Sequence, residues 1–237
     1  MKKLAASLLV VVAVIGAGVF WLSGNIDGLI GKAIEKYGSA MTQAKVSVGT
    51  VKIAPADGKG IIGDLVIGNP AGFKTAHAMK VSRIEVDIDI ASVTKDVIVI
   101  RRIAIIAPDI SYEKGSSMTN FDAIQKNIAS YLGPAGSKNN EQKGDKKLIV
   151  EELTIRQAKA QASAAFMNGK TVSVPLPDIT MRNLGKAKGG ITPGEMGQQV
   201  AGALIAKLGS AVNFEGLLKS ADGAVGKAGA AVKGLLK

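Results

Sequence analysis

Few residues of this chain have the types and spacing that chemistry requires. Glu85, Asp87 and Asp89 alternate along one segment, and three carboxylates together can hold a divalent cation. At every second position of a strand they share one face, where acidic side chains more often meet water, and we prefer that interpretation. The single histidine, His77, cannot build a multi-histidine metal site, so we expect no metal ion and no cofactor.

Motifs of known enzyme classes are missing from the sequence. There is no GxSxG nucleophile elbow, no phosphate-binding loop and no histidine pair, and Gly58-Lys59-Gly60 is interpreted as a turn. The chain has no cysteine, which excludes disulfides, thiol catalysis and lipid attachment through cysteine. We therefore do not expect an enzyme.

The charge balance indicates anionic partners. The 237 residues carry a formal net charge of +11, and only 4% of them are aromatic. Nucleic-acid binding usually needs aromatic stacking platforms or a recognition motif, and neither is found, so no nucleic-acid partner is expected. Phospholipids with anionic headgroups fit better, because the chain also has a strongly apolar N-terminus.

The segment Leu4–Leu22 is uncharged and follows Lys2 and Lys3. As a helix it would be roughly 29 Å long, enough to cross the hydrocarbon core of a bilayer. A cleaved signal peptide is the alternative, with Gly16-Ala17-Gly18 as a weak cleavage site. The apolar run continues past that site, so we expect residues 1–23 to form an uncleaved anchor. Its main membrane-contacting side chains would be Leu8, Leu9, Val12, Ile15, Phe20 and Trp21.

After the anchor, the period of the apolar residues changes along the chain. Asn25–Met41 has the helical period, and the helix either covers a sheet or lies on the membrane. From Val46 the period is two, with a change of phase at Gly49 that a β-bulge would produce. The predicted strands are Val46–Ile53, Ile61–Ile67, Ile84–Ile90, Val97–Ala107, Ile110–Tyr112, Leu148–Ile155, Lys159–Met167 and Asp178–Asn183. An α+β fold with a mostly antiparallel sheet follows.

Asn168-Gly169 predicts a hairpin. A three-residue loop, Met167-Asn168-Gly169, would pair Phe166 with Lys170 and Ala164 with Val172. Val172 would then lie on the apolar side of the sheet, and we prefer this register to that of a two-residue loop.

Two further helices have clear start signals, since Thr119–Asp122 and Thr192–Glu195 both have the capping-box form. The first helix should end at Gly133-Pro134, and residues 133–147 should be a disordered loop. Residues 186–237 are expected to form C-terminal helices and a basic amphipathic tail. That tail would be either a membrane-surface segment or poorly ordered.

Several short phrases, in their order along the chain, resemble a known family. They are Val46-Ser47-Val48-Gly49, Leu65-Val66-Ile67-Gly68-Asn69-Pro70, Ile84–Ile90, Ile100–Pro108, Val174–Thr180 and Asn183-Leu184-Gly185. With the anchor and the amphipathic helix, they are similar to the AsmA-like proteins of bacterial envelopes, which are related to the chorein-type bridge-like lipid-transfer proteins.

The resemblance implies a single-pass inner-membrane protein with a cytoplasmic N-terminus and its bulk in the periplasm. It further implies that residues 24–185 form a strongly curved antiparallel sheet, folded over into a groove and flanked by helices. The implied function is phospholipid transport or outer-membrane maintenance, by a lipid-binding or lipid-transfer module.

Inward-facing aliphatic side chains of such a sheet would line a lipid groove. The candidates are Leu65, Ile67, Ile84, Val86, Ile88, Ile90, Ile103, Ile105, Ala164, Phe166 and Val172. The alternative is a non-enzymatic structural or interaction scaffold of the envelope, in which these residues form only a core. Homo-oligomers and envelope proteins are possible partners of either kind of protein.

Overall fold

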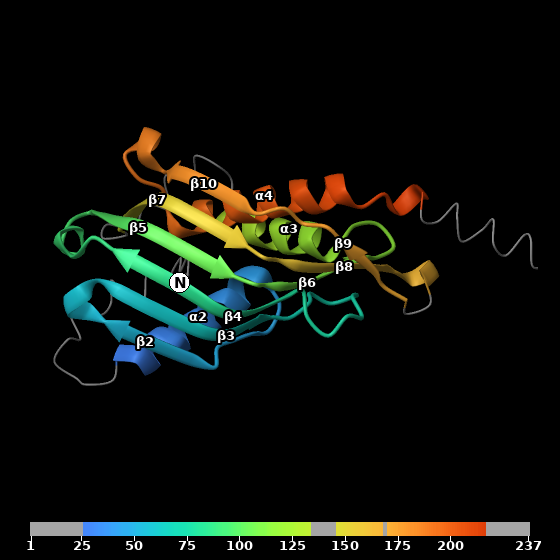
Figure 1. Ribbon diagram of the computed structural model, residues 1–237, viewed down its shortest axis with the longest axis horizontal. Helices are drawn as coiled ribbons and strands as arrows, with labels where there is room; N and C mark the ends of the chain where they lie inside the picture. The colour runs from blue at the N-terminus through green and yellow to red at the C-terminus, as the bar shows by residue number, and fades with distance from the viewer. Residues whose placement is uncertain (1–25, 134–145, 168–169, 217–237) are drawn as a thin grey trace, which may run out of the picture.

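The structure is a computed structural model that describes residues 26–133, 146–167 and 170–216 (Figure 1). In these ranges one ten-stranded sheet has three helices on one of its faces. The helices are α2 (Ile26–Thr42), α3 (Asn120–Leu132) and α4 (Pro193–Ala211). None of the helices described is long and apolar enough to cross a membrane, and the predicted anchor, residues 1–23, lies outside the described ranges.

The fold is α+β, and its sheet is mostly antiparallel, as predicted. Its strands are β1 (Val46–Ser47), β2 (Thr50–Ala54), β3 (Lys59–Ile67), β4 (Met79–Ile88), β5 (Val97–Ile106), β6 (Asp109–Lys114), β7 (Lys147–Arg156), β8 (Lys159–Ala164), β9 (Val172–Val174) and β10 (Ile179–Leu184). Strand β3 pairs with β1, β2 and β4, and the order continues as β4-β5-β7-β10 and β4-β6-β8-β9. The pairs β5–β7 and β6–β8 are parallel, because α3 lies in the connection between β6 and β7.

The helix start signals are confirmed. In α3 the Thr119 side chain accepts a hydrogen bond from the backbone N–H of Asp122, whose carboxylate accepts one from the Thr119 N–H. In α4 Thr192 and Glu195 form the same capping box. Each box satisfies backbone donors that a helix start leaves without intrahelical partners, so the starts are fixed by local sequence.

Three pairs of consecutive strands, β5–β6, β7–β8 and β9–β10, each form one long strand that is interrupted at the same row of the sheet. Across this row, β5 and β6 keep one register against β4, and the shift in the β4–β5 pairing lies away from it, between Asp87 and Ile88. β7 and β8 keep one register against β5 and β6, and β10 and β9 do so against β7 and β8. The interruptions line up with irregular residues in β2 to β4. We call this row the crease; its residues are Gly49, Asp64, Ser82, Ala107, Gln157 and Pro177.

At the crease every strand changes the face to which its apolar side chains point. Asp64, Ala107 and Gln157 have φ angles of 53°, 48° and 55°, in the left-handed region. In β3 this turns both Ile62 and Leu65 toward the helices, although they are three residues apart. β4 changes face in the same row without a positive φ angle, since Val81 and Ile84 are both buried. The predicted change of phase at Gly49 is real. The expected cause, a bulge in one strand, is wrong: pairing between β1–β2 and β3 has the same register on both sides of the row.

The face of the sheet toward the helices, here called the inner face, is the core of the domain. Helix α2 packs on β1 and β2, α3 on β6, and α4 on β10. At the inner face Tyr112 contacts Phe121 and Phe214, with ring centroids 6.2 and 5.5 Å apart. Burial raises the pKa of Tyr112, an effect that the side-chain hydrogen bond with Thr119 opposes and nearby Asp122 reinforces.

Two boundaries, the end of β4 and the start of β7, differ from the prediction. Strand β4 ends at Ile88, because the Asp89 side chain caps a 3₁₀ turn, Ile90–Ser92, by accepting a hydrogen bond from the Ala91 N–H. Asp89 is therefore not a third carboxylate on the strand. The expected loop 133–147 is shorter at its end, since β7 begins at Lys147 and the Lys146 ammonium donates to two backbone carbonyls. Residues 134–145 lie outside the described ranges.

The hairpin register was predicted wrongly. Strand β8 ends at Ala164, and Phe166 lies in a 3₁₀ turn, Ala165–Met167. Val172 pairs with Ala162 rather than with Ala164, so the loop is longer than three residues. Val172 is nevertheless on the same side of the sheet as the alanines of β8, as expected.

Replacing Ala107 with glycine should stabilise the fold by about 0.5–1 kcal/mol, because relief of left-handed strain exceeds the entropy that glycine loses. Ala104→Gly, three residues earlier in β5 at a buried position, is the matched control and should destabilise by about 1 kcal/mol. Thermal unfolding followed by circular dichroism measures both. A loss of stability in Ala107→Gly would mean that the crease is not strained.

Candidate functional site

The lipid-groove candidates divide into three groups by exposure. Ile84, Val86, Ile88, Ile103 and Ala164 are buried, with 6% or less of their surface exposed, and Leu65, Ile67, Ile105 and Phe166 are half-buried. Ile90 and Val172 are 44% and 41% exposed. The structure therefore brings most of the candidates together on the inner face, and it places Ile90 in a surface turn.

The buried candidates belong to the hydrophobic core rather than to an open surface. Ile84, Val86, Ile88 and Ile103 share one cluster with helix residues, namely Ile30 and Ile34 of α2, Phe121 of α3 and Leu208 of α4. A ligand reaches side chains such as Val86 only if a helix moves away. Packing of this kind is what a folded interior requires, and it leaves no room for an acyl chain along β4.

An apolar pocket does open at one end of the domain, where α4 ends beside β8 and β9. Its volume is about 350 Å³. It is lined by Ala162, Val172, Ser173, Val174, Ala211, Val212, Asn213 and Gly216. Among the groove candidates, Val172 lines this pocket.

A cluster of buried and half-buried polar side chains holds the β3–β4 connection against α3. We call it the clasp; its residues are Asn69, Thr75, Glu113 and Asn120. The Glu113 carboxylate accepts hydrogen bonds from the backbone N–H groups of Lys74 and Thr75, at 2.7–2.9 Å, and from the Thr75 hydroxyl at 2.8 Å. Glu113 is only 7% exposed, so these bonds replace the hydrogen bonds to water that its buried side chain has lost.

Asn120 is the centre of the clasp and is fully buried. Its amide donates to the Asn69 side-chain oxygen at 2.8 Å and to the Ser111 carbonyl at 2.7 Å. Its oxygen accepts from the backbone N–H groups of Glu113 and Phe121. One side chain thus links β6, the start of α3 and the loop after β3.

Sequence reasoning did not identify Glu113 or Asn120 as important. A signal was present: Asn69 lies in the phrase Leu65–Pro70, and Asn120 stands between a helix cap and an apolar stripe. Which polar groups meet in the interior depends on how the loop folds back, which local spacing does not reveal. The clasp holds this end of the domain in one arrangement. Its donors and acceptors bond to one another and do not face a substrate.

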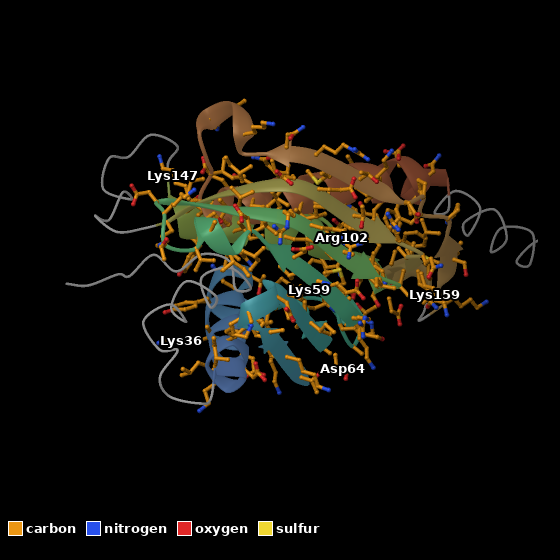
Figure 2. All side chains as sticks on the ribbon, turned by 60° about the vertical axis from the view of Figure 1, so that its left-hand side comes forward. Lys36, Lys59, Asp64, Arg102, Lys147 and Lys159 are labelled. Atoms are coloured by element: carbon orange, nitrogen blue, oxygen red, sulfur yellow. The ribbon has the colours of Figure 1, made fainter. Side chains whose placement is uncertain are left out.

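The other face of the sheet, here called the outer face, is polar. All five arginines of the chain lie on it: Arg83, Arg101, Arg102, Arg156 and Arg182, from strands β4, β5, β7 and β10. Figure 2 shows Arg102 among the side chains that project from the sheet. In β4 the buried residues Ile84, Val86 and Ile88 alternate with the carboxylates of Glu85 and Asp87, whereas Arg101 and Arg102 of β5 are adjacent and both exposed.

The two carboxylates of β4 are engaged with arginines of this face. Glu85 accepts from Arg83 at 2.8 Å and lies 3.8 Å from Arg102, and the Asp87 carboxylate is 2.8 Å from Arg101. This agrees with the interpretation of a water-facing carboxylate row. The residues described contain no group of three or more side chains that could hold a metal ion.

Comparisons with known proteins identify no relative: no protein-family model, no curated protein and no solved structure matches the chain.

Replacing Asn120 with alanine should destabilise the protein by about 2–4 kcal/mol, because it leaves buried donors and acceptors of three elements without partners. Asn127→Ala in the same helix is the control, because the Asn127 side chain donates a hydrogen bond only to the Thr42 carbonyl among its described contacts, and it should cost about 1 kcal/mol or less. Thermal unfolding compares the two. Equal losses would contradict a central role for Asn120.

Proposed function

We propose that this protein is a membrane-anchored, non-enzymatic scaffold of the bacterial envelope, in which the apolar sheet face serves as a core. The observation that carries the proposal is the burial of Ile84, Val86 and Ile88 beneath helices. Hydrophobic side chains that contact one another supply the stability of a domain and do not bind a ligand at the same time. The polar outer face and the sheet edges then remain for partners.

The anchoring part of the proposal rests on the sequence. Leu4–Leu22 directly precedes α2, so an anchor in these residues would hold the described domain at the membrane. The lysines before the apolar segment favour a cytoplasmic N-terminus and an exported domain. With the resemblance to envelope proteins, this supports a single-pass inner-membrane protein whose bulk is periplasmic.

Lipid binding or transfer is the second candidate, favoured by the pocket beside β9. Its volume of about 350 Å³ and its lining by Ala162, Val172, Val174 and Val212 suit part of an acyl chain. Each buried methylene contributes about 0.8 kcal/mol, so a few methylenes suffice for weak binding. In this version of the function, the lipid contacts the end of the sheet and not its centre.

Val86→Glu should unfold the domain, because an unpaired charge in the core costs at least about 3 kcal/mol. Ile90→Glu is the matched control from the same candidate set; its side chain is 44% exposed and the domain should stay folded. Circular dichroism measures whether each variant is folded. A folded Val86→Glu domain would show that the inner face is not a closed core.

Native mass spectrometry of residues 24–237, purified without detergent and followed by lipid extraction, should show a domain without stoichiometric phospholipid. Bound phospholipid that disappears in Val172→Glu, but not in Ile90→Glu, would replace the scaffold proposal with lipid binding at the pocket. Because both positions are exposed, loss of lipid in one variant alone is not explained by unfolding.

A further inference from the structure

A buried hydroxyl on the outer face has no partner. Thr154 of β7 lies between Leu153 and Ile155, whose side chains belong to the core. Because successive side chains of a strand point to opposite faces, the Thr154 side chain lies on the outer side of the sheet. Its exposed fraction is 1%, and its Oγ1 atom has no hydrogen-bond partner among the described residues. A polar atom without a partner is costly to bury, so a specific reason for its presence is needed.

The next outer residue of the same strand is an arginine without a carboxylate partner. Arg156 is two positions beyond Thr154 and is exposed. Each of the other four arginines forms an ion pair with an acidic side chain, at 2.8–3.8 Å for the closest atoms. Arg156 has no such pair with any residue that the structure describes. A free guanidinium therefore adjoins the unpartnered hydroxyl.

Small side chains and carboxylates that already have partners surround these two residues. Thr154 lies opposite Ala104 of β5 and Thr180 of β10. Asp178, the residue before β10, follows the Ile155–Ile179 pair and lies beside Arg156; its carboxylate accepts a hydrogen bond from the Gln157 backbone N–H at 3.0 Å. Glu85 is bound to Arg83 at 2.8 Å, and Glu152 is bound to Arg182 at 2.9 Å. The hydroxyls of Thr154 and Thr180 and the Arg156 guanidinium have no acceptor among the described residues, so the unmatched chemistry of this spot calls for an anion.

We propose that Thr154, Arg156 and Thr180 form a binding site for a phosphate group. The guanidinium donates to two oxygens of one anion, and the hydroxyls donate from the neighbouring strand positions. A phosphate fits better than a carboxylate, because its tetrahedral oxygens accept from several directions at once. Because Thr154 is only 1% exposed, binding requires the atoms over its hydroxyl to move aside.

The source of the phosphate is a soluble anion or the headgroup of a phospholipid. Both present the same group to the site, and a membrane-anchored domain meets both. The site does not depend on the scaffold proposal, because it lies on the outer face and requires neither a groove nor the pocket beside β9.

The test uses the full chain in a non-ionic detergent, with ¹⁵N-labelled arginine. Only five Nε–Hε signals are expected, and Arg156→Gln identifies its own signal by removing it. Inorganic phosphate and, separately, dihexanoylphosphatidic acid are titrated at constant ionic strength. Saturable shifts of the Arg156 signal by inorganic phosphate support a soluble ligand, and shifts by the lipid alone support a headgroup.

Thr154→Val is the decisive variant, because its two effects have opposite signs. It should weaken binding about tenfold, through loss of one charge-assisted hydrogen bond. In the absence of ligand it should raise the melting temperature by about 2–4 °C, because the unpartnered hydroxyl is gone. Lys52→Gln, an exposed β2 lysine on the same face, removes one positive charge as Arg156→Gln does and should leave binding unchanged.

Three outcomes would overturn the proposal. One is that neither probe shifts the Arg156 signal in a saturable way. Another is that Lys52→Gln weakens binding as much as Arg156→Gln, which would reduce the effect to net charge. The third is a Thr154→Val protein that binds as the wild type does, which would leave the hydroxyl with no part in binding.

Discussion

Burial of the inner face beneath α2, α3 and α4 is the interaction on which the other features of the domain depend. The side chains involved are almost entirely aliphatic, with a small aromatic group around Tyr112. Such side chains have no strong directional contacts, so the stability of the core comes from area removed from water and from close packing. Every strand must therefore keep its apolar residues on one side over its whole length.

The crease shows how the sheet meets this requirement. A long strand twists, and its inner face gradually turns away from a straight helix layer. A left-handed residue at Asp64, Ala107 and Gln157, in one row, resets the face in all three strands together. Because neighbouring strands change in step, their register is unaffected, and no backbone group of the ladder needs a new partner far away. The strain energy of a few left-handed residues is small beside the free energy gained from the apolar area that stays buried.

Much of this fold can be predicted from the sequence, for reasons that are local. The capping boxes at Thr119 and Thr192 and the two-residue period over Ile84–Ile88 are determined by near neighbours, and both were predicted correctly. The hairpin register failed because a 3₁₀ turn at Ala165–Met167 lengthens the loop, so that Val172 pairs with Ala162 and not with Ala164. The clasp was missed because Asn69 and Asn120 meet only after the chain has folded back.

The groove candidates illustrate a more general difficulty. A period-two row of Ile and Val residues has the same pattern whether helices or lipids cover it, so the sequence predicts the apolar face without its cover. The outer face is not subject to this ambiguity. There, alternation places the arginines at exposed positions, where they are free of the packing constraints of the core. The domain can therefore acquire a polar site on β7 and β10 without disturbing its interior, at the cost of one buried hydroxyl. The restriction of all arginines to that face, in a chain whose positive charges are mostly lysine, is the pattern that planar recognition of anions and carboxylates produces.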